Sequence, residues 1–288
     1  MSDPKQIIHI FGSGGVGSFL SKELDYESND ISFIDLRPNS ISTDLHSFKF
    51  DGKDYRYQKK FNYCEKANWN FICTKSYDIT DEFVAYLSKS KGHSVFIQNG
   101  TVVINRYAKL ENDFIFANFA SLDVQFSHST LHVKSSYPDI LFSSQGLNME
   151  AMAQIEMLFQ LTNIKVKFLQ DYNAVLSEKF PRWLLTNLIT ISSKESLGLA
   201  VKSMGRSKLT ALLDELARVL SGVLQIECDL DSLLKQVASL PAELTTSSYR
   251  DYFSGKQCEF LLEMKQLLGS ARRMGIPCQS LDAILERL

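Results

Sequence analysis

The sequence predicts an α/β domain followed by an all-helical domain. Two observations support this fold class. Short apolar runs rich in β-branched and aromatic residues alternate with helical patterns up to about residue 170. From Ala174 onwards the apolar residues follow a helical period, and no convincing strand pattern remains. We therefore expect an α/β domain over 1–170 and a helical domain over 171–288.

An apolar run enters a glycine cluster at the start of the chain. Residues 7–11 have the composition of a buried strand, and Gly12, Gly14 and Gly17 follow with the spacing Gly-x-Gly-x-x-Gly. Gly12 permits a tight turn, Gly14 lets a pyrophosphate approach the backbone, and Gly17 lets the next helix pack closely on the strand. That helix, expected to continue over 18–24, offers unpaired N–H groups to an anion. The pattern predicts a Rossmann-like dinucleotide-binding domain; the alternative is a glycine-rich turn in another kind of α/β protein. The predicted phosphate-binding residues are Gly12, Ser13, Gly14, Gly15, Val16 and Gly17.

A second strand, predicted over 31–35, ends in Asp35, about twenty positions beyond the glycines, where a dinucleotide fold presents a group to the adenosine ribose. A carboxylate there accepts hydrogen bonds from the ribose hydroxyls and favours NAD. Arg37, two residues later, is suited to pair with a 2'-phosphate and favours NADP. The cofactor is therefore NADP or NAD. The alternative role for Asp35 is a cap or turn residue before Pro38.

The next strands also end in polar residues. Residues 50–60 alternate as a short hairpin with Asp51-Gly52 as its turn, while 70–74 and 94–97 are predicted as buried strands. Lys75 follows the first of these two strands and Asn99 follows the second. Because open α/β sheets bind ligands at the carboxyl ends of their strands, both residues are candidate ligand contacts.

The remainder of the first domain is predicted to complete the sheet. A crossover helix is expected over 81–90, and patches of alternation over 114–144 predict antiparallel strands. A further helix is expected over 148–161 and a last strand over 165–168.

The helical half contains one strongly apolar helix. Pro181 is typical of the first turn of a helix, and the apolar residues that follow it predict a buried central helix. Asn187 and Lys194, seven residues apart, lie on nearly the same face of that helix. Further helices are expected over 208–227, 230–239, 255–274 and 281–288.

Composition excludes several classes of function. A net charge of -2, from 31 basic and 33 acidic residues, gives no electrostatic case for nucleic acid or an anionic membrane as partner. No segment has the length and apolar character of a signal peptide core or membrane span, so we expect a cytoplasmic protein. The five cysteines form no Cys-x-x-Cys pair, and the histidines, His128 and His132 included, show no convincing ligand spacing. We expect no disulfide framework and no metal site.

Taken together, these motifs resemble the ketopantoate reductase (2-dehydropantoate 2-reductase) family over essentially the whole chain. The resemblance rests on the glycine turn, on the residues after two inner strands, on an inward asparagine, and on a C-terminal signature. These are Gly12–Gly17, Thr74-Lys75, Gln98-Asn99-Gly100, Asn187, Thr246–Asp251, Gly255-Lys256 and Glu259. The resemblance implies a nicotinamide domain and a helical domain that close on a 2-keto acid, which NADPH reduces to a 2-hydroxy acid in pantothenate biosynthesis.

The resemblance also implies roles for individual residues. Lys75 contacts the adenosine phosphate region, and Asn99 lies near the nicotinamide ribose and the substrate. Asn187 touches the substrate, Ser247 binds its carboxylate, and Glu259 binds its hydroxyl end. Three of these have a structural alternative: Asn187 as a hydrogen-bonded core amide, Ser247 with Ser248 as a helix N-cap, and Glu259 as a solvated surface glutamate.

One departure from the family separates three hypotheses. The family's general acid is a lysine one helical turn before the inward asparagine, and Trp183 stands in that register, so the lysine is apparently replaced. Arg182 beside it carries a fixed charge but donates protons poorly; Lys179 and Lys194 are the other candidates for the acid. We expect a reductase of 2-dehydropantoate, or a reductase of a different keto acid whose extra carboxylate Arg182 grips. The third hypothesis is a catalytically impaired dinucleotide sensor or scaffold, and a homodimer is left open.

Overall fold

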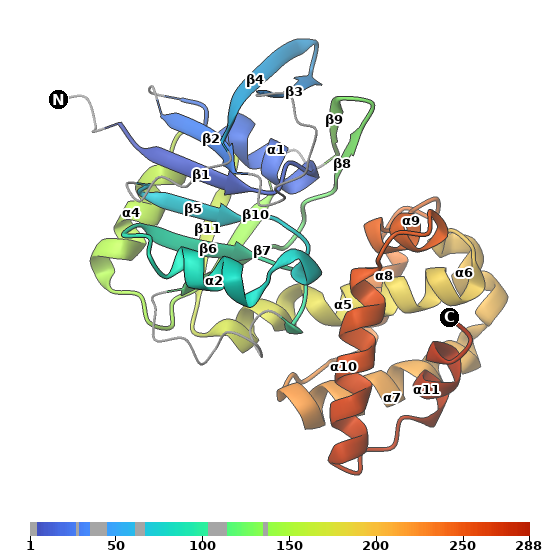
Figure 1. Cartoon of the computed structure of the whole chain (residues 1–288). Coiled ribbons are helices and arrows are strands. Elements are labelled where there is room, and N and C mark those ends of the chain that lie inside the picture. The colour runs from blue at the N-terminus through green and yellow to red at the C-terminus, as the bar shows by residue number, and fades with distance from the viewer. Residues whose placement is uncertain (1–4, 27–28, 35–44, 61–66, 103–113, 135–137) are drawn as a thin grey trace. The chain divides into compact units, whose positions relative to one another are not determined.

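The structure is a computed structural model, and Figure 1 shows it divided into two compact units. The first unit comprises Met1–Gln98 and Arg106–Val175, and the second comprises Asn99–Asn105 and Leu176–Leu288. The contacts of the short segment that begins at Asn99 therefore assign it to the helical unit. The domain limits expected from the sequence, 1–170 and 171–288, stay a prediction. The structure describes residues 5–26, 29–34, 45–60, 67–102, 114–134 and 138–288.

The described part of the first unit is built on an 11-stranded sheet in the order β11-β10-β7-β6-β5-β1-β2-β4-β3-β9-β8. Six neighbouring strands of this sheet run parallel. The six are β4 (Lys53–Lys60), β2 (Asp30–Ile34), β1 (Ile7–Phe11), β5 (Trp69–Ile72), β6 (His93–Ile97) and β7 (Phe114–Phe119). The chain leaves β1 for β2 on one side and later reaches β5 on the other, so β1 and β5 flank the point where the strand order reverses.

Antiparallel strands extend the sheet at both edges. Beyond β7 lie β10 (Asp139–Ser143), which is antiparallel to β7, and β11 (Lys165–Leu169), which is parallel to β10. Beyond β4 lie β3 (Leu45–Phe50) and the hairpin of β9 (Thr130–Val133) with β8 (Val124–Ser127).

The expectation of antiparallel strands over 114–144 is confirmed for β8 with β9 and for β7 with β10, whereas β7 is also parallel to its other neighbour, β6. The chain between Ile97 and Phe114 has room for the crossover of about a dozen residues that a parallel neighbour requires. The predicted hairpin turn is confirmed, since Asp51 and Gly52 take φ angles of 47° and 74° between β3 and β4.

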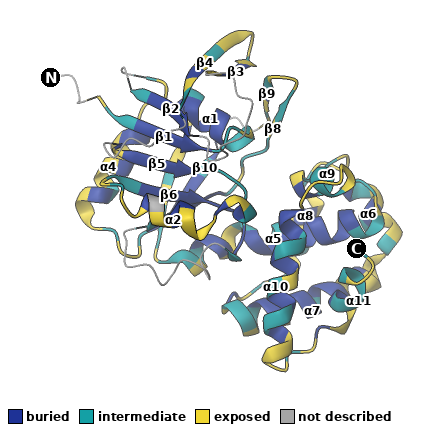
Figure 2. Ribbon diagram, in the orientation of Figure 1, coloured by how far each residue is buried: buried dark blue, intermediate teal, exposed yellow. Residues whose placement is uncertain are grey.

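Helices cover the sheet and close its core. They are α1 (Gly15–Glu23), α2 (Asp81–Leu87), α4 (Met149–Phe159) and the short 3-10 helix η1 (Ser76–Asp78). Phe19 and Leu20 of α1 and Phe159 of α4 join the strand residues in one apolar cluster. Figure 2 shows the central strands buried while α2 carries an exposed outer face. Burial of each large side chain contributes about 1.5–3 kcal/mol, so this core fixes α1 on the sheet.

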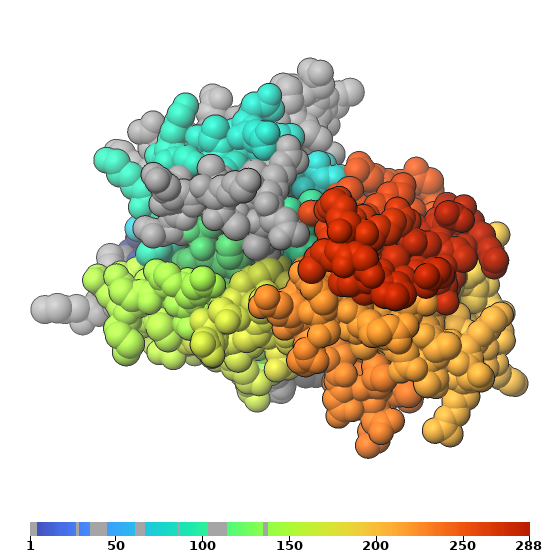
Figure 3. All heavy atoms as spheres, turned by 90° about the horizontal axis from the view of Figure 1, so that it is seen from below, coloured from blue at the N-terminus to red at the C-terminus, as the bar shows by residue number. Residues whose placement is uncertain are grey.

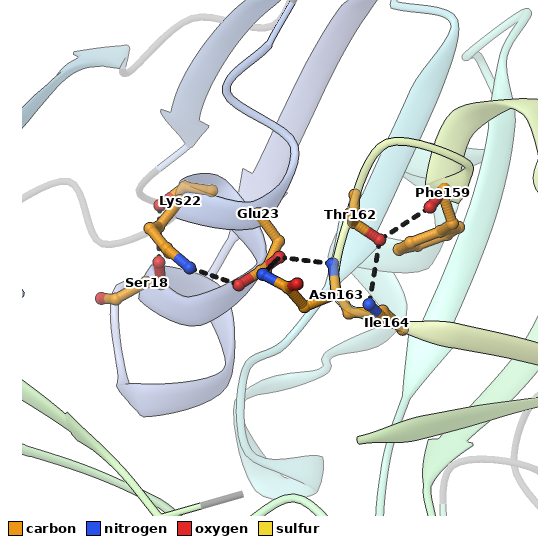
Figure 4. Close-up of polar contacts among 8 residues, drawn as sticks. Ser18, Lys22, Glu23, Phe159, Thr162, Asn163 and Ile164 are labelled. Carbon is orange, nitrogen blue, oxygen red and sulfur yellow. Dashed lines mark hydrogen bonds and ion pairs between the residues drawn. The ribbon is translucent and has the colours of Figure 1, made fainter. Parts of the chain in front are cut away.

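A buried carboxylate ties the end of α1 to the turn before β11 (Figure 4). Glu23 is 7% exposed, pairs with the Lys22 ammonium, and accepts a hydrogen bond of 3.0 Å from the backbone N–H of Asn163. Thr162 stabilises the same turn by donating its hydroxyl to the Phe159 carbonyl and accepting from the N–H of Ile164. The far end of α1 is therefore anchored, which helps hold its N-terminus and the glycine turn in place.

The described second unit is entirely helical in its regular elements (Figure 1). Its first helix, α5 (Tyr172–Ser193), starts in the first unit and continues into the second. The last two helices contact each other, and the Arg272–Asp282 ion pair joins them. The C-terminal residues, red in Figure 3, lie together on the face shown. The other helices are α6 (Leu197–Met204), α7 (Arg206–Leu224), α8 (Leu230–Ala238), α9 (Ser247–Phe253), α10 (Glu259–Arg273) and α11 (Gln279–Leu285).

The expected position of Pro181 is wrong. It lies in the interior of α5 and not in a first turn. An interior proline costs about 3 kcal/mol because it removes a backbone hydrogen bond and crowds the preceding turn. Here it sits among fully buried residues of the same helix, including Phe180, Leu184 and Leu185. Their packing outweighs the local cost, so the helix continues through the proline.

Candidate functional site

The glycine turn after β1 packs tightly against two neighbours. Gly12 has φ +104°, and a Cβ there would lie 2.8 Å from the carbonyl carbon of Cys73 and from the N of Thr74, at the end of β5. A Cβ on Gly17 would lie 2.0 Å from the carbonyl oxygen of Gly12. Both positions exclude any side chain, because backbone atoms cannot move aside as a flexible side chain can. The turn thus brings α1 directly onto the end of β1.

The front of this turn is open. Gly14 is the exposed N-cap of α1, it makes no side-chain cap, and a Cβ there would meet nothing within 4 Å. The first turn of α1 carries no acidic side chain to compete with an anion. The unpaired N–H groups and the positive end of the helix dipole at this N-terminus fit the diphosphate of a dinucleotide. The same turn includes the partly buried Ser13, Gly15 and Val16.

Polar groups gather at the ends of β5 and β6 in the first unit. Gln98 follows β6 and donates its amide to the carbonyl of Thr74, at 2.8 Å, so the two strand ends are joined. Lys75, the next residue, is partly buried and precedes η1. The backbone of Thr74 packs beside Gly12, and Lys75 is the next residue, so Lys75 follows directly after the contact with the glycine turn. Asp35 and Arg37 fall outside the described residues, so both stay predictions.

In the second unit, Asn99 and Lys179 form a hydrogen bond. The Lys179 ammonium, on α5, donates to the amide oxygen of Asn99 at 2.9 Å. The pKa of Lys179 is lowered to about 8: burial lowers it most, the positive charge of Arg182 also lowers it, and the negative charge of Glu259 opposes the shift. A group with a pKa close to the working pH is suited to give up and regain a proton.

The helical unit also contains two buried carboxyl groups, both on α10. Glu259 begins the helix and is 3% exposed, and Glu263, one turn later, is 1% exposed. The Glu263 carboxylate accepts hydrogen bonds from the N–H and hydroxyl of Thr101 and from the N–H of Val102, at 2.9–3.0 Å. The pKa of Glu263 is raised to about 7: burial raises it most, the hydrogen bonds from Thr101 and Val102 oppose the shift, and the charge of Glu259 adds to it. Sequence reasoning missed Glu263, although a glutamate four residues after another in an apolar stretch was a signal.

Trp183 belongs to an aromatic cluster on the turn of α5 that follows Lys179. Its ring stacks on Phe180 at 5.8 Å and meets Phe260 edge-on at 6.2 Å. Arg182, beside it, is partly buried, and burial lowers its pKa while the charge of Glu178 opposes this shift. The tryptophan therefore presents an apolar surface where a family member is expected to be polar.

Asn187 is fully buried and links α5 to α9. Its amide nitrogen donates to the Trp183 carbonyl at 2.7 Å, and its oxygen accepts from the hydroxyl of Thr246. Thr246 is the N-cap of α9, because its hydroxyl accepts from the N–H of Tyr249 at 2.9 Å. The N-cap expected at Ser247 and Ser248 is therefore wrong. Ser247 is exposed and Ser248 is buried inside the first turn.

Among the three candidate proton donors, Lys179 contacts a predicted site residue, Asn99. Lys194 follows the end of α5, is exposed, and has φ +62°. The Tyr249 hydroxyl, on α9, donates a hydrogen bond to the Lys194 carbonyl, so the backbone of Lys194 helps join the end of α5 to α9. In the described parts of the chain, no group of three or more His, Cys, Asp or Glu is arranged to hold a metal ion, and no helix is long and apolar enough to cross a membrane.

Residues 8–124 match the family model described as Ketopantoate reductase PanE/ApbA. This match confirms, for residues 8–124, the resemblance drawn from the motifs. No curated protein sequence matches the chain.

Solved structures share the fold over nearly the whole chain. A dimeric ketopantoate reductase from Staphylococcus aureus has a TM-score of 0.76 at 15% identity, covering 97% of this chain and 96% of its own. A 2-dehydropantoate 2-reductase from Porphyromonas gingivalis W83 has a TM-score of 0.74 at 14% identity, covering 99% of each chain. D-mandelate dehydrogenase in complex with NADH has a TM-score of 0.78 at 14% identity, covering 98% of this chain and 97% of its own. The predicted fold class, a Rossmann-like domain followed by helices, is confirmed.

Proposed function

We propose that this chain, whose residues 8–124 match the ketopantoate reductase family, reduces a small 2-keto acid to a 2-hydroxy acid with NADPH or NADH. The observation that carries the proposal is the hydrogen bond between Lys179 and Asn99, because it presents a partly buried ammonium with a pKa of about 8. The first substrate to test is 2-dehydropantoate, which the family match favours.

The first unit supplies the nucleotide site in this proposal. The open N-terminus of α1 and the side-chain-free turn at Gly12, Gly14 and Gly17 fit a diphosphate. Lys75 is proposed to pair with the phosphate on the adenosine side. A bound reduced nicotinamide supplies the hydride, and the protein orients the reactants. The D-mandelate dehydrogenase neighbour holds NADH, so both reduced nucleotides belong in the test.

The second unit supplies the proton. When the substrate carbon accepts hydride, the C=O double bond becomes a single bond and its oxygen takes up one proton. Lys179 donates that proton from Nζ, and Asn99 holds the ammonium through its amide oxygen. Arg182 keeps its own proton at working pH and helps hold the pKa of Lys179 down. We therefore assign the acid to Lys179 among the three candidates.

The remaining substrate contacts follow from the family resemblance. Ser247 is proposed to bind the substrate carboxylate, and Glu259 its hydroxyl end. If the substrate is a different keto acid, Arg182 is proposed to bind its extra carboxylate. The side-chain amide of Asn187 already bonds the Trp183 carbonyl and the Thr246 hydroxyl. A substrate contact would therefore have to share the amide nitrogen or oxygen with one of these partners.

The aromatic cluster favours a second substrate class. Trp183, one helical turn from Lys179, is partly buried and packs its ring against the fully buried Phe180 and Phe260. D-mandelate dehydrogenase, a neighbour of the same fold, has been solved with NADH and anilino(oxo)acetate, an aryl-bearing oxo acid. A 2-keto acid with an aryl substituent is therefore the alternative to 2-dehydropantoate.

The test titrates NADPH and NADH by protein fluorescence and then adds 2-dehydropantoate or phenylglyoxylate while nicotinamide absorbance is followed. Binding followed by loss of absorbance with either acid supports the proposal and names the substrate class. Tight nucleotide binding without oxidation by any acid in a wider panel favours the sensor or scaffold alternative. No binding of either nucleotide contradicts the role given to the glycine turn.

Two further predictions concern the assembly and its location. The Staphylococcus aureus ketopantoate reductase is dimeric, which supports testing this chain for a homodimer by sedimentation. A cytoplasmic location stays a prediction.

A further inference from the structure

We propose that Glu263 is a positioning residue for the reduction, holding the backbone after Asn99 so that the Asn99 amide meets the Lys179 ammonium. This inference rests on the proposed function. Glu263 accepts hydrogen bonds from Thr101 and Val102, the two residues that follow Gly100, and acts on Asn99 through this backbone.

The contact resembles a clamp on the backbone. One carboxylate oxygen accepts from both the N–H and the hydroxyl of Thr101, at 2.9 and 3.0 Å. The other accepts from the N–H of Val102 at 3.0 Å. Both oxygens are thus used, and they fix two consecutive peptide planes. A bidentate contact of this kind restricts rotation as well as distance.

Gly100 makes the clamp sterically possible. A Cβ at this position would lie 1.9 Å from a carboxylate oxygen of Glu263 and 2.1 Å from its carboxyl carbon. The carboxyl group therefore occupies the space that any side chain at residue 100 would need. Because Asn99 precedes this glycine directly, fixing the backbone at Thr101 limits where the Asn99 side chain can point.

The burial of Glu263 argues for a purpose beyond packing. The side chain is 1% exposed, and a buried carboxylate is costly unless donors compensate it. An apolar residue of similar size would fill the helix face without that cost. Three directed hydrogen bonds to one short segment are what the carboxylate adds, and that segment begins with a residue bound to Lys179.

A matched pair of variants tests the role. Glu263→Gln keeps the shape of the side chain but replaces one acceptor oxygen with an NH₂ donor facing N–H groups. Glu215→Gln makes the same change at another buried carboxylate of the helical unit, which accepts from the N–H of Leu281 at 2.9 Å. We expect Glu263→Gln to lower kcat about 10–100-fold with the nucleotide Kd unchanged, since small misplacement of a reacting group has effects of this size. We expect Glu215→Gln to lose thermal stability to a similar extent as Glu263→Gln but to keep the kcat of the unaltered protein.

A double-mutant cycle with Asn99→Ala separates positioning from general damage. If Glu263 acts through Asn99, kcat of the double variant equals that of Asn99→Ala alone, because the second change removes nothing further. Fully multiplicative losses, or an equal loss of kcat in Glu215→Gln, would overturn the proposal.

Amide hydrogen exchange tests the clamp without any substrate. In Glu263→Gln we expect exchange at Thr101 and Val102 to be at least about tenfold faster, because each N–H loses its acceptor. Unchanged exchange overturns the clamp itself. Faster exchange in a protein that reduces no 2-keto acid shows that the clamp exists but that the proposed function, and with it the catalytic role of Glu263, is wrong.

Discussion

The glycine turn and the Lys179 cluster differ in the kind of atom that builds them. The turn is made of backbone: its two packed glycines exclude side chains, and its open face presents N–H groups. The cluster is made of buried and partly buried side chains, in which the charge of Glu259 raises the pKa of both Lys179 and Glu263. A backbone site is neutral and insensitive to pH, whereas the side-chain site depends on burial and on charges from two helices. The first is suited to holding a nucleotide and the second to moving a proton.

Removing the ammonium should separate the two sites most strongly. In Lys179→Met, we expect kcat for ketone reduction to fall about 100- to 10,000-fold, the usual range for a general acid. Stopped-flow or steady-state assays measure the fall, and fluorescence titration should give an unchanged nucleotide Kd. Lys194→Met is the control, because Lys194 is exposed at the end of α5. Equal losses in both variants would contradict the assignment.

The buried carboxylate should make folding stability depend on pH. The pKa of Glu263 is raised from 4.5 to about 7 in the folded protein, so folding takes up a proton between these values. This contribution to stability is fully present below pH of about 4.5 and is lost as pH rises through about 7, on the order of 3 kcal/mol. Chemical denaturation of the unaltered protein and Glu263→Gln across this range measures it. A Glu263→Gln variant with the same pH dependence would contradict the shift.

Adding one methyl group to the turn should damage the backbone site alone. Gly12→Ala places a Cβ 2.8 Å from backbone atoms at φ +104°, and we expect a loss of about 1–3 kcal/mol in unfolding free energy. Nucleotide binding should weaken at least about tenfold, equivalent to 1.4 kcal/mol. Gly146→Ala is the matched control, since Gly146 also has positive φ, +80°, but open space around it. Equal effects at both glycines would show that backbone strain, and not the close approach to β5, matters.

The smallest expected effect is at the cap of α9. Thr246→Val keeps the shape of the side chain but removes the hydroxyl that accepts from Tyr249 and donates to Asn187. We expect unfolding free energy to fall by about 0.5–2 kcal/mol, the usual cost of a lost N-cap. Thermal unfolding measures this, and Ser247→Ala, which changes an exposed residue beside the cap, should have a smaller effect.

The same contrast explains what the sequence could predict. The glycine turn and the Asp51-Gly52 hairpin depend on local backbone conformation, so residue types and spacing were enough to find them. The pairing of Asn99 with Lys179 and the contact of Glu263 with Thr101 join residues 80 and 162 positions apart. No local pattern encodes such distances. Pro181 was misplaced for a related reason, because tertiary packing overrides the local cost of an interior proline.

The central claim, that Lys179 is the proton donor, is tested most directly by the pH dependence of kcat for keto acid reduction at saturating nucleotide. With a Lys179 pKa of about 8, the rate should fall about tenfold per pH unit above that pH, as the ammonium loses its proton. The residual activity of Lys179→Met should lack this fall. A profile that stays flat beyond pH of about 10, or one that is identical in Lys179→Met, would contradict the account.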